Sequence, residues 1–328
     1  MVTDDDVIKQ KIQEIFLFNL KDLALNESKE IAHYTSAEAG YAILKEQKFW
    51  FRNTKYMNDF SEGQWGWNLL VKAYNGTKDT QTRTLKAALD SIAPKLSEKF
   101  EEMMNNQRHN QDWHPYISCF CEHDFLENKE DDHGKLSMWR AYSRPHGVCL
   151  VFAKDVFLEG DETIDNLLTT KVRYWDQGEF KDQYYNILVN NINKHKDWDW
   201  IQHSVSSEDL LFILQKVLWF ACHSIKHPGF KEEEEWRVVT WSEANEASDY
   251  MAKETVFRGG TPEIIYTLDL KKLSERIPDV AIDKFIKRII IGPSDKTQEQ
   301  REAFIDILKQ NNVDNPEERV VISGIPLR

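Results

Sequence analysis

The sequence predicts an α+β fold with a mixed or antiparallel β-sheet core and helical insertions. Short apolar runs typical of strands crowd into the C-terminal third of the chain. Residues 117–152 show the order strand, loop, helix, strand, and two stretches near 83–104 and 181–226 carry apolar residues at helical spacing. The sum of these elements predicts an α+β domain with a mixed sheet core and helical insertions.

The first elements are an N-terminal helix and a strand that leads into a second helix. Residues 5–20 have helical periodicity, and 1–30 are expected to form a helical extension. His33 and Tyr34 should end a strand, because Thr35-Ser36-Ala37-Glu38 has the pattern of a capping box at a helix start. A strand at 49–52 then precedes a polar loop that carries Asn58, Asp59 and Glu62.

The remaining elements follow from apolar periodicity. A helix at 83–104 contains Pro94, which should interrupt it. We expect further helices at 136–143, 181–196, 207–226 and 297–311, and strands at 117–121, 147–152, 172–175, 236–241, 255–258, 264–268, 285–291 and 320–323. Neither an internal repeat nor a Pro/Gly-rich linker interrupts residues 31–328, so we expect one elaborated domain there.

Composition and charge narrow the classes of function open to this chain. The 328 residues carry a formal charge of −13, which disfavours non-specific binding to a phosphate backbone. We expect a cytoplasmic protein without a membrane partner, because the chain has neither an 18-residue apolar run nor a secretion signal at its start. The four cysteines lie in apolar runs and suit buried thiols. Cys119, Cys121 and His123 lack the usual zinc-ligand spacing, so we expect no metal site.

The strongest candidate for chemistry is the run from Glu232 to Glu235, which abuts the strand beginning at Trp236. Alternation along a strand should direct Glu233 and Glu235 to the same side and Glu234 to the other. Crowded carboxylates raise one another's pKa and suit base catalysis or stabilisation of a cation. The alternative interpretation is a solvated acidic turn.

Other polar side chains lie near strand ends. His33 can bond a ribose or phosphate oxygen, and Tyr34 can stack on a flat ring. Arg52 can clamp an anion, whereas Asn58, Asp59 and Glu62 are equally explained as turn and cap residues. On the helix at 136–143, Trp139 should pack on the core. Arg140 and Tyr142 can reach a pocket.

Several common enzyme motifs are absent. The sequence has no P-loop, G-x-G-x-x-G, G-x-S-x-G or H-E-x-x-H pattern, which disfavours ATP hydrolysis, Rossmann redox chemistry, the α/β-hydrolase route and zincin proteolysis.

Taken together, the ordered motifs resemble a bacterial family known as domain of unknown function 2971. The resemblance spans residues 31–293 and rests on His33-Tyr34-Thr35, the Trp50 strand with Asn58-Asp59 and Glu62, Ser118-Cys119-Phe120, Met138-Trp139 with Tyr142, Gly147-Val148-Cys149, Glu235-Trp236-Arg237, and Ile290-Ile291-Gly292. The arrangement also resembles the ADP-ribosyltransferase fold, whose split sheets hold NAD in a cleft and break its nicotinamide–ribose bond.

That resemblance implies specific roles. His33, with Thr35 beside it, would hold the adenosine-side ribose, and Tyr34 or Tyr142 would stack on nicotinamide. Glu235 would steady the ribose cation, with Glu233 as the auxiliary carboxylate of an E-x-E pair. Arg52 would clamp the pyrophosphate or help to orient the acceptor. Asn58, Asp59, Glu62 and Arg140 would complete the cofactor-binding set.

The expected function is an ADP-ribosyltransferase-like enzyme or NAD glycohydrolase with NAD as its substrate. It would be a bacterial toxin or phage-defence effector that modifies a nucleic-acid base or a protein side chain, with an antitoxin or defence-system partner. One alternative is a non-catalytic sensor of a nucleotide-like ligand. Another is a metal-dependent nuclease that uses Asp59, Glu62, Glu233 and Glu235.

Overall fold

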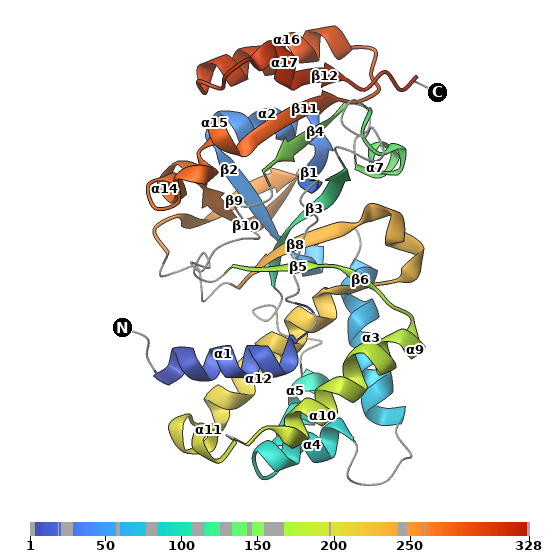
Figure 1. Ribbon diagram of the computed structural model, residues 1–328, viewed down its shortest axis with the longest axis vertical. Helices are drawn as coiled ribbons and strands as arrows, with labels where there is room; N and C mark the ends of the chain where they lie inside the picture. Colours follow the sequence, from blue (N-terminus) through green and yellow to red (C-terminus); the bar gives the residue numbers. More distant parts are fainter. Residues whose placement is uncertain are drawn as a thin grey trace. The chain divides into compact units, whose positions relative to one another are not determined.

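The computed structural model describes residues 4–18, 20, 29–56, 60–76, 84–106, 115–124, 133–142, 146–153, 167–196, 198–241, 248–258 and 260–326. We expected one domain from residue 31 onward. Contacts between Cα atoms group the chain into two compact units. Unit 1 comprises Met1–Asp22, Thr54–Pro115 and Thr170–Lys231, and unit 2 comprises Leu23–Asn53, Tyr116–Thr169 and Glu232–Arg328. Each is built from several separate segments of the chain (Figure 1).

Unit 2 is organised around a mixed sheet. The strand order β12-β11-β4-β1-β3-β2-β10-β9 forms its main path, and β8 pairs with β3 while β5 pairs with β8. The β11–β12 pair is parallel, and the other registered pairs of this sheet are antiparallel. The strands are β1 (Lys29–Ser36), β2 (Lys48–Asn53), β3 (Tyr116–Asp124), β4 (Gly147–Phe152), β5 (Leu168–Lys171), β8 (Glu235–Thr240), β9 (Met251–Arg258), β10 (Thr261–Asp269), β11 (Ile286–Ile291) and β12 (Val320–Ile322).

The two faces of this sheet carry different side chains. Residues opposite each other in an antiparallel pair point to the same face. We call one the His33 face; it also carries Ile31, Phe120 and Trp236. We call the other the Tyr34 face; its members are Ala32 and Tyr34 of β1, Cys119 and Cys121 of β3, Glu235 and Arg237 of β8, and Cys149 and Val151 of β4.

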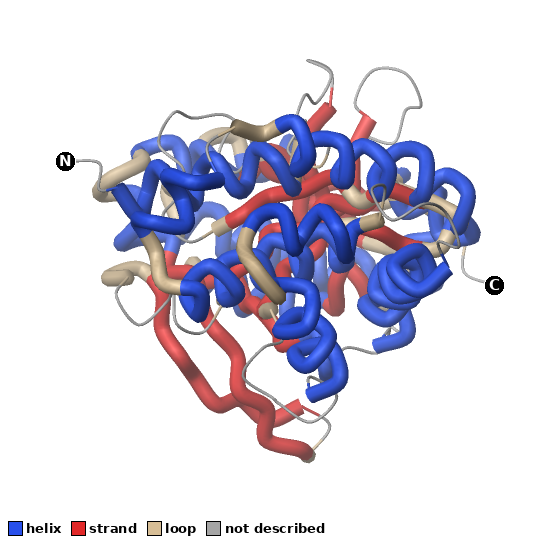
Figure 2. Tube along the Cα trace, turned by 90° about the horizontal axis from the view of Figure 1, so that it is seen from below, coloured by secondary structure: helices blue, strands red, loops and turns tan. Residues whose placement is uncertain are grey.

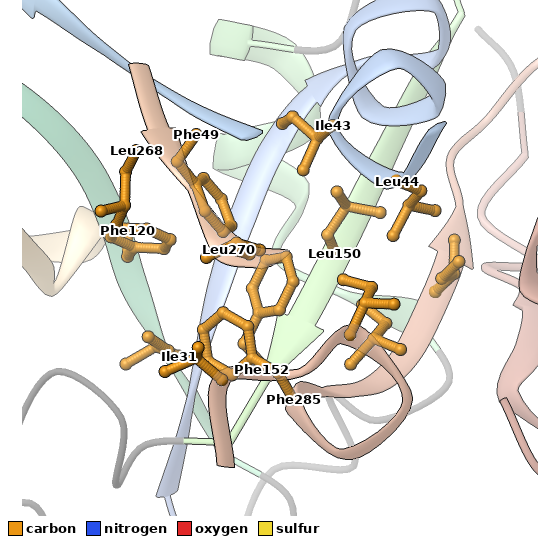
Figure 3. Close-up of a cluster of buried hydrophobic side chains, with 14 of the residues drawn as sticks. Ile31, Ile43, Leu44, Phe49, Phe120, Leu150, Phe152, Leu268, Leu270 and Phe285 are labelled. Carbon is orange, nitrogen blue, oxygen red and sulfur yellow. The ribbon is translucent and has the colours of Figure 1, made fainter. Parts of the chain in front are cut away.

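The main core of unit 2 lies on the His33 face. Phenylalanine rings from β2, β3, β4 and the α15 helix converge there, with ring centroids 5.1 Å apart for Phe49–Phe152 and 4.6 Å for Phe152–Phe285 (Figure 3). Phe49 is also 5.5 Å from Phe120. Burial of each such ring contributes about 1.5–3 kcal/mol, so this cluster is a major source of stability.

Helices cover this core. Ile43 and Leu44 of α2 and Phe304 of α16 pack into the same cluster as the sheet residues. The helices of unit 2 are α2 (Ala37–Glu46), α7 (Leu136–Tyr142), α14 (Leu270–Ser274), α15 (Ile282–Phe285), α16 (Thr297–Gln310) and α17 (Pro316–Arg319), with a short 3₁₀ turn at Pro278–Val280. The α7 helix contributes Met138 and Trp139 to a second cluster, which lies on the Tyr34 face.

Unit 1 is mainly helical. Gly66 of α3 lies so close to the Cys222 carbonyl of α12 that a Cβ atom there would be 2.1 Å from its oxygen, and Trp67 stacks on Trp219 at 5.0 Å. Its elements are α1 (Asp4–Phe16), a 3₁₀ turn at Thr54–Tyr56, α3 (Phe60–Gly76), α4 (Leu85–Ile92), α5 (Leu96–Asn106), α9 (Gln177–Phe180), a π turn at Lys181–Tyr185, α10 (Asn186–Lys194), α11 (Trp198–Ser204), α12 (Ser207–His223), and the parallel pair β6 (Arg173–Tyr174) and β7 (Ile225–Lys226). A further 3₁₀ turn, η4 (Pro228–Glu233), leads from unit 1 to β8.

The predicted mixture of helices and a mixed sheet is confirmed, as Figure 2 shows by colour. The expected helical stretches near 83–104 and 181–226 supply α4, α5 and α10 to α12, and residues 93–95 separate α4 from α5 as Pro94 predicted. Within the described residues, the strands form one ten-stranded sheet and one two-stranded sheet.

Two local predictions were wrong. The helix α2 is capped by Ser36, whose Oγ accepts a hydrogen bond from the Ala39 amide at 3.2 Å, so the cap lies one residue later than the proposed capping box. The expected loop carrying Glu62 is interrupted by α3, which begins at Phe60. Its Gly63 and Gly66 weakened the helical pattern. The strand expected at 172–175 is present in shortened form as the two-residue β6, and β5 just before it was not predicted.

Candidate functional site

The carboxylates at the start of β8 lie beside α7. Tyr142 at the end of α7 donates a hydrogen bond to Oε1 of Glu233 at 3.3 Å, and Lys135, just before α7, pairs with Oε2 of Glu234. The two contacts place the acidic segment, Glu232–Glu235, beside α7.

We expected strand alternation to direct the side chains of Glu233 and Glu235 to the same side. The backbone conformation at Glu234 shows why this alternation does not apply to Glu233. Glu234 has a left-handed conformation with φ 43°, and β8 begins only at Glu235. A non-glycine residue in this region is strained and is held by its surroundings. Here the Glu234 carbonyl accepts a hydrogen bond from the Glu122 amide at 3.0 Å, and its side chain pairs with Lys135. Glu233 and Glu234 consequently both contact the α7 segment.

Glu235 forms a bidentate ion pair within its own strand. Nε and Nη2 of Arg237 donate to Oε1 and Oε2 of Glu235 at 2.6 and 3.0 Å. The side chains are only 8% and 4% exposed, respectively, for Glu235 and Arg237. Residues two apart on a strand share a face, which brings the two groups together. Such a fork-to-fork contact fixes both side chains and their charges on the Tyr34 face.

Tyr34 is a buried support for α7. Its ring contacts Trp139 edge to face at 4.7 Å, and its hydroxyl accepts a hydrogen bond from the Lys135 amide at 2.7 Å. Burial raises the pKa of Tyr34 far above its ordinary value, with smaller contributions from Cys149 and Cys121, so the phenol stays protonated. A Cβ atom on Gly292 would lie 2.8 Å from the Trp139 ring, so the glycine leaves space for this indole.

His33 lies on the opposite face from Glu235. Its Nδ1 is 2.8 Å from the Cys119 carbonyl oxygen, and its ring lies 5.6 Å from Phe120. Burial lowers the pKa of His33, and the contact with the Cys119 carbonyl opposes that shift. Thr35 shares this face, because it is two residues further along β1. The sheet therefore separates His33 and Thr35 from Glu235.

Arg52 shares the Tyr34 face with Glu235 but lies further along the sheet. It is opposite Ile117, which in turn is opposite Val239, four residues after Glu235. That displacement is roughly 13 Å along the strand. The Arg52 guanidinium instead pairs with Glu263, with Nη2 at 3.0 Å and Nε at 3.3 Å from Oε2.

The structure thus brings Glu233, Glu235, Tyr34 and Tyr142 to one side of the sheet around α7. Arg140 is exposed on α7, and Tyr142 is 41% exposed, so both reach solvent beside the acidic segment. Asn58 and Asp59 lie outside the described residues, as does the side chain of Glu62. The sequence interpretation named Arg237 in the motif with Glu235 but missed Lys135, whose charge also complements the acidic run. Lys135 is 99 residues from Glu234, so the sequence gave no local signal for that contact.

The described residues contain four cysteines and several possible metal ligands. All four cysteines are free thiols; Cys121, Cys149 and Cys222 are buried and Cys119 is partly exposed. Burial raises the pKa of Cys222, which keeps it a protonated thiol. Within the described ranges, three or more His, Cys, Asp or Glu side chains do not gather into a possible metal site.

The segment that contains α7 and the start of β8 also carries a similarity to a known family. Residues 138–238 match the model of a family described as protein of unknown function (DUF2971). The match includes Tyr142, Glu233, Glu235 and Arg237, and begins after His33 and Arg52. Searches of curated proteins and of solved structures gave no match. A search of the described helices found none with the length and hydropathy of a membrane span.

Proposed function

We propose that the chain binds NAD and cleaves its nicotinamide–ribose bond at the acidic segment beside α7, as an ADP-ribosyltransferase-like enzyme. The observation that carries the proposal is the contact between Tyr142 and Glu233 at the start of the strand that bears Glu235. It places an exposed aromatic ring beside an E-x-E pair. An aromatic ring can stack on nicotinamide, while a carboxylate can stabilise the cation left when nicotinamide departs.

In the proposed reaction the bond between the ribose C1′ and the nicotinamide nitrogen breaks, and nicotinamide leaves with the electron pair. The positive charge on the ribose is stabilised by Glu235, which Arg237 holds in one orientation. Water or a macromolecular nucleophile then forms a new bond to C1′, and Glu233 accepts its proton. Tyr142, hydrogen-bonded to Glu233, positions that carboxylate.

The ADP-ribosyltransferase-like fold, a cytoplasmic location and a role as toxin or phage-defence effector belong to the same proposal. The net charge of −13 favours a pocket that accepts a single exposed base or side chain over a groove that follows a duplex. His33 and Thr35 lie on the other face of the sheet from Glu235, so the proposal does not depend on them.

The test compares the wild-type protein with Glu235→Gln, Glu233→Gln and the matched control Glu232→Gln, which changes an exposed neighbour. Each is incubated with NAD, with and without bacterial lysate, and nicotinamide release and ADP-ribose transfer are followed by mass spectrometry. We expect turnover by the wild type and the control, and a loss of about 100-fold or more in Glu235→Gln. Turnover that is unchanged in Glu235→Gln would refute the assignment.

Folding must be monitored in the same experiment, because removal of one partner of a buried ion pair costs about 3–5 kcal/mol. Thermal unfolding of each variant provides this check. Tyr142→Phe offers a milder test, since it removes one exposed hydroxyl and keeps the ring. We expect it to retain NAD binding and to lower the catalytic rate.

A second function is favoured by the Glu235–Arg237 pair itself. Both carboxylate oxygens already accept hydrogen bonds from Arg237, which suits a rigid binding module that senses a nucleotide without cleaving it. This reading predicts that NAD raises the unfolding temperature while nicotinamide release stays at the background level. A ligand at 100 times its Kd stabilises a folded protein by about 2.7 kcal/mol, which is readily measured.

A further inference from the structure

The strand β9 lies at an edge of the unit 2 sheet. Among the described strands it pairs with β10 alone and ends the strand order. Phe257 on β9 is 76% exposed, and Ile264 on β10 is 44% exposed on the same face. Exposed edge strands with large apolar side chains are templates for pairing with another strand.

The hairpin geometry identifies the backbone groups that face outward. Arg258 and Thr261 are opposite each other and flank a two-residue turn, so they form the hydrogen-bonded pair that closes the hairpin. Hydrogen bonding to β10 then recurs at every second residue of β9 toward Ala252. The amide and carbonyl groups of the alternate residues, which include Thr255 and Phe257, point away from β10, toward the edge of the described sheet.

The charges on β9 favour pairing with a second copy of itself. Glu254 and Arg258 are four residues apart and therefore lie on the same face. An antiparallel pair of β9 strands centred on Val256 places Glu254 of each copy opposite Arg258 of the other, and Thr255 opposite Phe257. A register centred on Glu254 instead opposes two carboxylates, which is unfavourable.

The surroundings of Arg258 supply a second argument. Glu263 pairs directly with Arg52 and also attracts Arg258. Partial burial and the nearby Arg52 charge lower the pKa of Arg258, while Glu263 opposes that shift. A further carboxylate next to Arg258 would offset the repulsion between the two guanidinium groups.

We propose that two copies of the chain associate through their β9 edges, in antiparallel register about Val256, to form a continuous sheet across the dimer. An interface of one strand and a few side chains falls at the small end of specific interfaces, so the dimer should be weak and concentration-dependent. This inference is independent of the NAD proposal, because it uses no residue of the acidic segment.

Sedimentation velocity over two decades of protein concentration tests the dimer. We expect a reversible monomer–dimer equilibrium in the wild type. Thr255→Pro removes an outward amide without removing a hydrogen bond to β10, and should weaken dimerisation at least tenfold. Arg258→Glu places two carboxylates opposite each other and should weaken it similarly. The matched control Lys287→Glu makes the same charge change at an exposed residue of β11 and should have no effect.

A charge exchange tests the register. Glu254→Lys combined with Arg258→Glu recreates the complementary pairs and should restore much of the association lost in Arg258→Glu. Thermal unfolding checks that the loss of the Lys48–Glu254 ion pair leaves the monomer folded. A wild type that is monomeric at every concentration, or a dimer that persists in Thr255→Pro, would overturn the proposal. Failure of the exchange in a dimer that Thr255→Pro disrupts would overturn the Val256 register.

Discussion

At the scale of single residues, alternation along β1 places the neighbouring side chains of His33 and Tyr34 on opposite faces of the sheet. His33 and Tyr34 are neighbours in sequence, yet one packs against Phe120 in the main core and the other lies beneath Trp139. Because side chains on a strand alternate, adjacent residues cannot line the same surface. The sequence motif predicted polar groups near a strand end. It did not reveal that Glu235 would share a face with Tyr34 and not with His33.

The depressed pKa of His33 predicts a pH-dependent stability. Burial disfavours the imidazolium, so the unfolded chain, with an ordinary histidine pKa of 6.5, binds the proton more readily than the folded one. The free energy of unfolding should therefore be at its full value above that pH and fall as the pH drops through it. One such group contributes a slope of at most about 1.4 kcal/mol per pH unit.

Urea unfolding of the wild type and of His33→Gln, from about pH 8 to about pH 5, measures this contribution. Glutamine retains a donor for the Cys119 carbonyl but does not titrate. The wild type should lose more stability on acidification than the variant. Identical pH profiles would show that His33 does not carry the effect.

At the scale of elements, the packing of α3 against α12 depends on the close approach of Gly66 to the backbone of Cys222. A Cβ atom on Gly66 would meet the carbonyl oxygen, carbonyl carbon and Cα of Cys222 at 2.1, 2.8 and 2.9 Å. These are backbone atoms, which cannot move aside without a shift of the helix. The glycine that weakened the helical signal in the sequence is thus required by the packing of two helices.

Gly66→Ala should destabilise the protein by about 1–3 kcal/mol, although alanine has the higher helix propensity. The matched control is Gly178→Ala in α9, whose Cβ would contact only the Asp176 side chain, at 3.3 Å. Chemical denaturation of both variants gives the comparison. Equal stabilities would mean that α3 and α12 can separate without cost.

For the whole molecule, the notable feature is that the two units interleave along the chain. The chain changes unit after residues 22, 53, 115, 169 and 231, so neither unit is one continuous segment. Each has buried side chains of its own, such as Tyr184 and Phe220 in unit 1 and Phe49 and Phe152 in unit 2. Insertion of helices into a sheet protein explains why composition gave no boundary, because the linkers are not distinguished by Pro or Gly content.

Separate cores predict that unfolding departs from two-state behaviour. Differential scanning calorimetry of the full chain should give a calorimetric enthalpy larger than the van't Hoff enthalpy. Gly66→Ala should lower the transition assigned to unit 1 more than that assigned to unit 2. One transition with equal enthalpies, shifted as a whole by Gly66→Ala, would show that the two units unfold together.

The sequence by itself determined the α+β class, most strands and helices, and the acidic segment at the start of β8, because apolar periodicity and charge runs are local properties. The strand order, the helix α3 and the partners of Glu233 and Glu234 were decided only by the tertiary structure. Lys135 and Tyr142 lie about 90 or more residues from the carboxylates that they contact. Such pairings depend on strand register and face, which a single sequence does not encode locally.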